Sequence, residues 1–296
     1  MRTFHHHDFA DLGSLISEKE AKGLSVSLCI PTLNEEGTIA RIVECMRREL
    51  VDSRPLLDEL IVIDSGSTDR TRTLAAEAGA QVIEASSILP FQGKRTGKGE
   101  NLWKAVHQCK GDIICFVDGD IGNIHARFVY GTVGPLIRDE DLGYVKGFYE
   151  RPLLASEGVD PRGGGRVTEL LVRPLFARFC PDLTGLHQPL AGEYAARRSV
   201  LEMIPFPTGY GVETAHLIDV WRTFGIGAIA QTDLDERIHR NRSLADLGRM
   251  SGEILDAFFA RFPEVTEASE ERPPMISLAD YHERFSKSAK GARKNA

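Results

Sequence analysis

The segment Asp112–Asp120 reads DIICFVDGD and places two carboxylates directly after an apolar run. The predicted strand, Asp112–Val117, is apolar at successive positions after its first residue, which is typical of a strand buried on both faces of a parallel sheet. Ligands of such sheets bind beyond the carboxyl ends of the strands. Asp118 and Asp120 are therefore the first candidate binding residues.

Short apolar runs alternate with helical patterns on the amino-terminal side of this segment. Strands are predicted at Ser25–Pro31, Glu59–Asp64 and Ala80–Glu84, and helices at Glu35–Leu50, Thr68–Ala78 and Gly99–Lys110. Strands separated by helices form right-handed βαβ units. The sequence therefore predicts an α/β fold with a Rossmann-like, mostly parallel central sheet flanked by helices.

The composition is that of a soluble globular protein and excludes several classes. The chain has 296 residues, 42% of them hydrophobic, and a formal net charge of −7, which argues against binding of duplex nucleic acid. No apolar run reaches the ~18 residues of a membrane span, and residues 1–24 lack a signal-peptide core. The five cysteines contain no CxxC pair, so neither a disulfide framework nor a cysteine zinc site is expected. We expect a soluble, cytoplasmic protein that binds neither nucleic acid nor membrane.

The two ends differ in composition from the middle. Residues 1–24 form a polar N-terminal extension, in which the run His5, His6 and His7 can hold a metal ion but is more typical of a solvated tail. Residues 263–296 mix charges with prolines and predict a flexible C-terminal tail. The folded domain is predicted at residues 25–262.

Two common nucleotide-binding motifs are absent. The first predicted strand is followed by PTLNEE (Pro31–Glu36) rather than by the G-x-G-x-x-G of a dinucleotide fold. The segment Gly93–Gly99, GKRTGKG, has its glycines one residue too close for a P-loop and ends in glycine where serine or threonine is needed.

A nucleotide-sugar site is the third interpretation. An Asp-x-Asp at a strand end, here Asp118-Gly119-Asp120, supplies the oxygen ligands that hold Mg²⁺ or Mn²⁺ against a diphosphate. This short motif is weak on its own. Together with PTLNEE, with DSGSTD at Asp64–Asp69 and with GKG at Gly97–Gly99, it resembles the GT-A glycosyltransferase fold.

Four motifs in the second half of the chain narrow the resemblance to one group of glycosyltransferases. The motifs are GGGRVTEL at Gly163–Leu170, QPLAGEY at Gln188–Tyr194, GYGVE at Gly209–Glu213 and HRNR at His239–Arg242. They resemble glucosyl-3-phosphoglycerate synthases and the related bacterial mannosyl-3-phosphoglycerate synthases, over roughly Ser25 to Arg261. The resemblance implies a nucleotide-sugar-binding half at 25–120 and an acceptor-binding half at 121–262. One departure is Gly119, where the family carries serine, at a position that the resemblance places near the donor ribose and sugar.

The resemblance assigns donor-binding roles to a set of residues at the loops. They are Pro31, Leu33, Glu35, Ser65, Lys98, Asp118, Gly119 and Tyr210. Backbone groups beside Pro31 and Leu33 can meet a base edge, and the Glu35 carboxylate can accept from ribose hydroxyls. A first-turn glutamate that favours the helix dipole is the alternative for Glu35.

Lys98 lies between two glycines at a predicted helix start. There the backbone can approach a phosphate, with N–H groups pointing outward. The resemblance implies that Lys98 contacts the nucleotide or its diphosphate, whereas an exposed loop lysine is the alternative.

Metal binding is implied for Asp120 and His239, with Asp118 at the ribose or at metal-bound waters. The cofactor would be a divalent cation, Mg²⁺ or Mn²⁺, acting as a Lewis acid on the departing nucleoside diphosphate.

An anionic acceptor fits the glycine-rich motif. Gly163–Gly165 can expose consecutive N–H groups to an anion, Arg166 adds a bidentate donor and Thr168 a hydroxyl. Asn241 and Arg237 are candidates for the glycerate carboxylate. The alternative for this motif is a flexible surface loop.

The catalytic group implied by the resemblance is Asp120, Leu190, Glu213 and His239. The backbone carbonyl of Leu190 would lie beside the anomeric carbon and Glu213 would face the sugar hydroxyls. The reaction would retain the α configuration through a front-face displacement, with Glu213 as a covalent nucleophile the less favoured route.

The predicted function is transfer of glucose from a nucleoside-diphosphate glucose, UDP-glucose being favoured, to 3-phosphoglycerate. Transfer of mannose from GDP-mannose is the alternative within the family. A nucleotidyltransferase is disfavoured because the first loop lacks a glycine-rich basic stretch, and a non-catalytic sugar-nucleotide-binding protein is a remote alternative. The resemblance also implies a homodimer and a role in compatible-solute biosynthesis.

Overall fold

Strand β5 (Ile113–Phe116) lies inside an eight-stranded sheet with the order β1-β10-β6-β9-β5-β2-β3-β4. The computed structural model describes residues 1–151, 153–155, 158–160, 165–238 and 243–263. The other strands of this sheet are β1 (Arg2–His5), β2 (Val26–Thr32), β3 (Glu59–Asp64), β4 (Gln81–Glu84), β6 (Tyr144–Glu150), β9 (Tyr194–Arg197) and β10 (Ile229–Glu236). Two short strands, β7 (Leu153–Ala155) and β8 (Gly158–Asp160), form a separate antiparallel pair.

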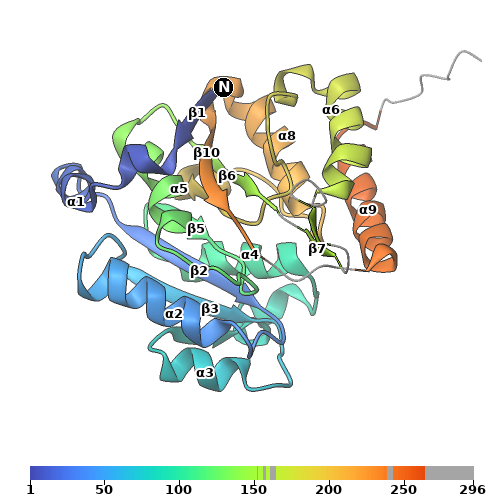
Figure 1. The fold of residues 1–296 in the computed structure, drawn as a ribbon. Helices are drawn as coiled ribbons and strands as arrows, with labels where there is room; N and C mark the ends of the chain where they lie inside the picture. The colour runs from blue at the N-terminus through green and yellow to red at the C-terminus, as the bar shows by residue number, and fades with distance from the viewer. Residues whose placement is uncertain (152, 156–157, 161–164, 239–242, 264–296) are drawn as a thin grey trace, which may run out of the picture. The chain divides into compact units, whose positions relative to one another are not determined.

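The sheet is parallel except at β9, which runs antiparallel to both β5 and β6. Helices flank it: α1 (Leu12–Ala21), α2 (Ile39–Arg47), α3 (Thr71–Glu77), α4 (Lys98–Gln108), α5 (Arg127–Arg138), α6 (Arg173–Phe179), α7 (Arg198–Leu201), α8 (Val212–Phe224) and α9 (Leu244–Phe259) (Figure 1). The prediction of a mostly parallel α/β sheet is confirmed.

The core forms where the apolar residues of sheet and helices meet. Ile39, Ile42, Val43 and Met46 of α2 are fully buried, as their helical spacing predicts. Burying each such side chain contributes about 1.5–3 kcal/mol. Helix α2 begins four residues later than predicted, because the chain first makes a turn in which the Glu35 carbonyl accepts the N–H groups of Thr38 and Ile39.

The prediction of a solvated N-terminal tail is wrong for the histidine run. Strand β1 pairs in parallel with β10, and Figure 1 shows the dark-blue strand beside the orange one. His6 is 4% exposed, and its Nε2 lies 2.7 Å from Oδ2 of Asp235. Backbone pairing at the sheet edge orders this segment despite its polar side chains. The side chains of Phe9 and Leu15, which follow it, are buried in the core.

Among the described residues, no helix is both long and apolar enough to cross a membrane. The five cysteines are buried and free. The chain divides into a unit of Met1–Arg261, which holds the sheet, and a second unit from Phe262. The predicted tail falls almost entirely on residues 264–296, outside the described residues.

Candidate active site

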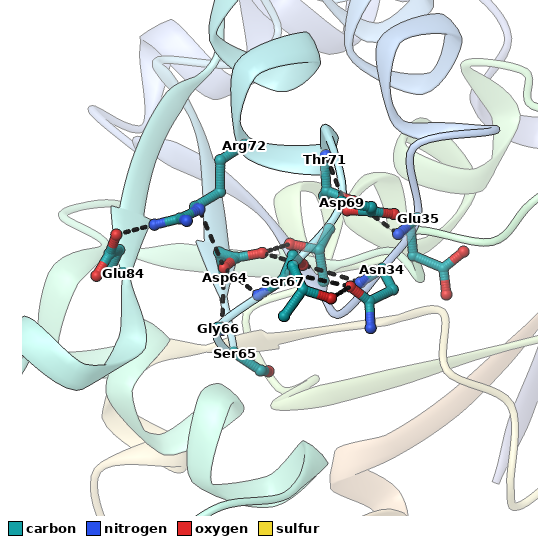
Figure 2. Close-up of polar contacts among 12 residues, drawn as sticks. Asn34, Glu35, Asp64, Ser65, Gly66, Ser67, Asp69, Thr71, Arg72 and Glu84 are labelled. Atoms are coloured by element: carbon teal, nitrogen blue, oxygen red, sulfur yellow. Dashed lines mark hydrogen bonds and ion pairs between the residues drawn. The ribbon is translucent and has the colours of Figure 1, made fainter.

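The loops that follow β2 and β3 are bound to each other, as Figure 2 shows. Asn34 adopts a left-handed backbone conformation with φ 57°. Its N–H donates to Ser67 Oγ at 2.8 Å, and its Oδ1 accepts the Thr68 N–H at 2.9 Å. Asparagine tolerates this conformation better than most residues. Asn34 thus joins the two loops.

Asp64, the last residue of β3, shapes the second loop. Its carboxylate is 1% exposed and accepts the N–H groups of Gly66 and Ser67 at 3.0 and 2.8 Å (Figure 2). These bonds satisfy the buried charge within the turn. Ser65, a predicted donor residue, follows it, and its hydroxyl oxygen accepts a bond from Asn101 of α4.

The first loop places its predicted donor residues close to the acidic motif. Leu33 is 53% exposed, and the Glu35 N–H donates to Thr71 Oγ1 at 2.7 Å. A Cβ on Gly119 would lie 3.1 Å from Cγ2 of Thr32 and 3.4 Å from Cγ of Glu35. A serine at this position would therefore press the first loop outward by a few tenths of an ångström.

Lys98 lies between two carboxylates from different elements. Its Nζ lies 2.8 Å from Oδ1 of Asp118 and 2.8 Å from Oε1 of Glu213, at the start of α8. Burial on its own lowers the pKa of Lys98, but the two carboxylates outweigh burial and hold that pKa above its usual value. Lys98 is therefore a fixed ammonium beside the acidic motif and not an exposed loop lysine.

The glycines on either side of Lys98 serve packing. A Cβ on Gly99 would lie 1.8 Å from the carbonyl oxygen of Pro207, and one on Gly97 would lie 2.4 Å from that of Thr208. The N–H groups of Gly99 and Glu100 donate to the carbonyls of Gly209 and Thr208 at 3.3 and 2.9 Å. These two N–H groups are not turned outward toward a phosphate, so that expectation is wrong.

Arg237, a predicted acceptor residue, binds both carboxylates of the acidic motif. The side chain is 3% exposed. Its Nη2 donates to Oδ1 of Asp120 at 2.6 Å and to Oδ2 of Asp118 at 3.1 Å, while Nη1 donates to Oε2 of Glu193 at 3.2 Å. Burial alone would raise the pKa of Asp118, but Lys98 and Arg237 outweigh it and hold that pKa well below the usual range.

Tyr149 connects this network to a cavity. Its hydroxyl donates to Oε2 of Glu193 at 2.5 Å and accepts from Arg237 and Arg151, both at 2.8 Å. The cavity has a volume of about 720 Å³ and is lined by the end of β6 and the residue after it, by the segments before and within α6, by the loop before β9 and by β10, among them Tyr149, Arg151, Gly165, Thr168 and Arg173. Gly165 and Thr168, two predicted acceptor residues, therefore line one cavity, whereas Arg166 and Arg237 are not part of its wall.

Of the remaining predicted residues, Leu190 and Tyr210 lie on loops that reach the acidic motif and the start of α4. A Cβ on Gly192 would lie 2.1 Å from Oδ2 of Asp118, so the loop that carries Leu190 runs directly against the acidic motif. The Tyr210 N–H donates to Oε2 of Glu253 at 2.7 Å. The predicted residues His239 and Asn241, and Gly163 and Gly164 of the glycine motif, lie outside the described residues.

Three residues of the network carry no role in the sequence analysis: Tyr149, Arg151 and Glu193. Glu193 stands inside the quoted motif QPLAGEY, directly before β9, which is the one signal that could have pointed to it. Tyr149 lies on β6, a strand that the sequence analysis does not predict.

The described part of the acidic motif suits a divalent cation. The Asp120 side chain is 25% exposed. Of its two carboxylate oxygens, only Oδ1 accepts a hydrogen bond from a described residue. Carboxylate oxygens are ligands that Mg²⁺ and Mn²⁺ prefer. Asp120 would hold such an ion, which when bound would supply positive charge to a leaving diphosphate.

The sheet with its one antiparallel strand, and the acidic motif at its carboxyl edge, define a glycosyltransferase of the GT-A fold. A family model described as glycosyl transferase family 2 matches residues 27–149. The glucosyl-3-phosphoglycerate synthase of Petrotoga mobilis is 46% identical over 98% of both chains, and that of Mycobacterium tuberculosis is 47% identical over 84% of this chain and 78% of its own. The chain belongs to the glucosyl-3-phosphoglycerate synthase family.

A solved structure agrees over most of the fold. The M. tuberculosis glucosyl-3-phosphoglycerate synthase, crystallised with Mn²⁺, UDP-glucose and phosphoglyceric acid, superposes with a TM-score of 0.80 at 43% identity. The match covers 88% of this chain and 87% of that one.

Proposed function

We propose that this protein transfers glucose from UDP-glucose to 3-phosphoglycerate with retention of configuration, using Mn²⁺ or Mg²⁺. The observation that carries the proposal is the network that joins the acidic motif to the cavity through Tyr149, because it sets the residues proposed for the cation and the donor beside the cavity proposed for the acceptor. The relative from M. tuberculosis is crystallised with glucosyl-3-phosphoglycerate, UDP and Mn²⁺, and also with Mg²⁺ and UDP, which supports the choice of substrates and ions.

The donor binds at the carboxyl ends of β2, β3 and β5 in this proposal. Pro31, Leu33, Glu35 and Ser65 hold the nucleoside, and Gly119 keeps the first loop close to the acidic motif. Lys98 places a permanent positive charge beside Asp118, where the diphosphate binds. Tyr210 borders the donor from the loop that packs on the start of α4.

The acceptor binds in the cavity. Gly165 has φ +80° and open space around its Cβ position, so its backbone can approach an anion closely. Thr168 supplies a hydroxyl from the cavity wall. Arg166 lies outside that wall but directly follows Gly165, and in this proposal its side chain reaches the bound acceptor; Arg166 and Asn241 then supply donors to the phosphate and carboxylate. Arg151, which lines the same cavity, adds a further positive charge.

The reaction proceeds on one face of the sugar. The acceptor hydroxyl attacks the anomeric carbon on the side from which the diphosphate leaves, and the Leu190 carbonyl lies beside the developing positive charge. The attacking hydroxyl gives its proton to the departing diphosphate oxygen, so no enzyme base is needed. Glu213, held by Lys98, accepts from the sugar hydroxyls. Asp120 and His239 hold the cation.

A donor panel tests this proposal. UDP-glucose, GDP-glucose, GDP-mannose and UDP-galactose are each incubated with 3-phosphoglycerate and Mn²⁺, and the nucleoside diphosphate and sugar product are identified. We expect glucosyl-3-phosphoglycerate from UDP-glucose at the highest kcat/KM. A preference for GDP-mannose would replace the proposal by a mannosyl transfer, and donor binding without turnover would identify a binding protein. We further propose a cytoplasmic homodimer that makes a compatible-solute precursor, which light scattering and metabolite analysis would check.

A further inference from the structure

Asn123 binds the peptide groups on both sides of Arg237. Its Nδ2 donates to the Glu236 carbonyl at 2.9 Å, and its Oδ1 accepts the Ile238 N–H at 2.8 Å. The amide side chain supplies the donor from its nitrogen and the acceptor from its oxygen. Both bonds go to the backbone, so they hold the chain itself and do not depend on the neighbouring side chains.

The contact continues into the backbone next to Asn123. The Gly122 N–H donates to the Ile238 carbonyl at 2.7 Å, and a Cβ on Gly122 would lie 3.0 Å from that oxygen. Both polar groups of Ile238 are therefore bound to the loop after β5. This contact therefore fixes the backbone up to Ile238, the last described residue of this segment.

The preceding residues are fixed from a second side. The Arg127 guanidinium donates to the carbonyls of Leu234 and Glu236 at 2.7 and 3.1 Å. Between these two carbonyls, Asp235 has φ 66° and the pairing of β10 with β6 shifts register. Such a bulge re-aims the residues that follow it.

The acidic motif and Asn123 share one loop, which runs on from β5. Asn123 holds the backbone of Arg237, while Asp118 and Asp120 bind its guanidinium. We propose that Asn123 is a positioning residue that fixes Arg237, and the backbone from Glu236 to Ile238, at the correct distance from Asp120. The inference rests on the proposed function, in which Asp120 and His239 hold the cation.

The variants Asn123→Asp and Asn123→Ala separate this role from plain stability. Asn123→Asp keeps the shape and the acceptor for Ile238, but it sets a carboxylate oxygen against the Glu236 carbonyl. Gln81→Glu, on the exposed edge strand β4, is the control for the same change of charge. We expect kcat to fall ~10–100-fold and the Mn²⁺ concentration for half-maximal activity to rise ~10-fold in both Asn123 variants, as for partners that orient metal ligands. The KM for 3-phosphoglycerate should change less than ~3-fold.

Calorimetric binding of Mn²⁺ in the presence of UDP gives a readout without turnover. Weaker Mn²⁺ binding by Asn123→Asp, at an unchanged melting temperature, supports the positioning role. Wild-type kcat and Mn²⁺ binding in Asn123→Asp would overturn it, as would equal losses in kcat and in both KM values that follow a loss of thermal stability. If Asn123→Ala does not fold, Asn123→Asp decides. If the wild type has no activity with UDP-glucose and 3-phosphoglycerate, the proposed function fails, and the Mn²⁺–UDP measurement still tests Asn123.

Discussion

The guanidinium of Arg237 lies 2.6 Å from a carboxylate oxygen of Asp120, the residue expected to hold the cation. Because Arg237 also binds Asp118 and Glu193, it stays anchored when the charge of Asp120 is removed. The variant Asp120→Asn should therefore fold normally and lose its Mn²⁺-dependent activity by at least ~100-fold, because a neutral amide binds a divalent cation poorly. Initial rates over a Mn²⁺ series check this, with circular dichroism as the control for folding. The same loss is expected for His239→Ala, and near-wild-type rates in either variant would remove that residue from the metal site.

Lys98 lies between the partly exposed carboxylate of Asp118 and the buried carboxylate of Glu213, and its removal should be costly. In Lys98→Met, Asp118 and Glu213 lose their shared cation, and breaking a buried ion pair costs about 3–5 kcal/mol in the free energy of unfolding. We expect the double variant Lys98→Met/Glu213→Gln to lose less free energy of unfolding than the losses of the two single variants added together. Urea unfolding measures this. As a control, truncating the exposed pair Arg249 and Asp246 should change the stability by less than about 1 kcal/mol. Strict additivity of the Lys98 and Glu213 changes would show that these two residues are not coupled.

Acceptor binding should depend on Arg166. We expect Arg166→Ala to raise the KM for 3-phosphoglycerate by ~10-fold or more, about 1.4 kcal/mol of binding, with little change in the KM for UDP-glucose. Steady-state kinetics with each substrate varied in turn measure this split. Arg54→Ala, an exposed arginine on the loop before β3, serves as the matched control for lost charge. Equal effects on both KM values would assign Arg166 to another role.

Gly99 should not tolerate a methyl group. A Cβ there would lie 1.8 Å from the Pro207 carbonyl oxygen, so Gly99→Ala must displace the loop that leads to Tyr210 and α8. We expect a loss of about 1–3 kcal/mol in stability, as for overpacking, and a higher KM for the donor. In contrast, Gly252→Ala in α9 has open space and should stabilise the protein by about 0.5–1 kcal/mol. Equal melting temperatures for the two variants would contradict this.

Lys146 should make stability depend on pH. The side chain is 1% exposed, and burial lowers its pKa to about 7. In the unfolded chain its pKa is about 10.4, so between pH 7 and 10 the unfolded state binds a proton that the folded state lacks. The free energy of unfolding therefore rises with pH over this range, by up to about 1.4 kcal/mol per pH unit. Lys146→Met should lack this rise. Urea unfolding of both proteins at pH 7.5 and 9 tests it, and parallel changes in the two would show that Lys146 titrates normally.

The sequence predicts the strands with uniform apolar runs and misses those with buried polar residues. Strands β2, β3, β4 and β5 agree with their predicted positions within one residue or so. Strand β6 buries Lys146, and β10 buries Gln231 and Thr232, so neither has the continuous apolar run of a strand buried on both faces. Strand β1 carries arginine and histidine at the sheet edge, where backbone pairing outweighs side-chain pattern.

The site residues also divide into those that a local sequence pattern predicts and those that it does not. Short motifs locate Asp118, Asp120 and Lys98, because each directly follows a recognisable strand or begins a helix. The position of Arg237 could not be predicted, because it depends on a bulge in a strand that the pattern does not reveal. Tyr149 and Glu193 become neighbours through the antiparallel strand β9, a long-range pairing that no local pattern encodes.

The pairing of β1 with β10 also dictates an order of events during synthesis. Arg2 pairs with Ala230, so strand β1 waits, once it is made, for a partner that is synthesised after nearly all of the sheet. Contacts between such distant residues form late, and an unpaired edge is open to other chains until they do. A bulky fusion or a deletion at residues 2–5 should therefore lower the yield of soluble protein in the cell, through aggregation of nascent chains.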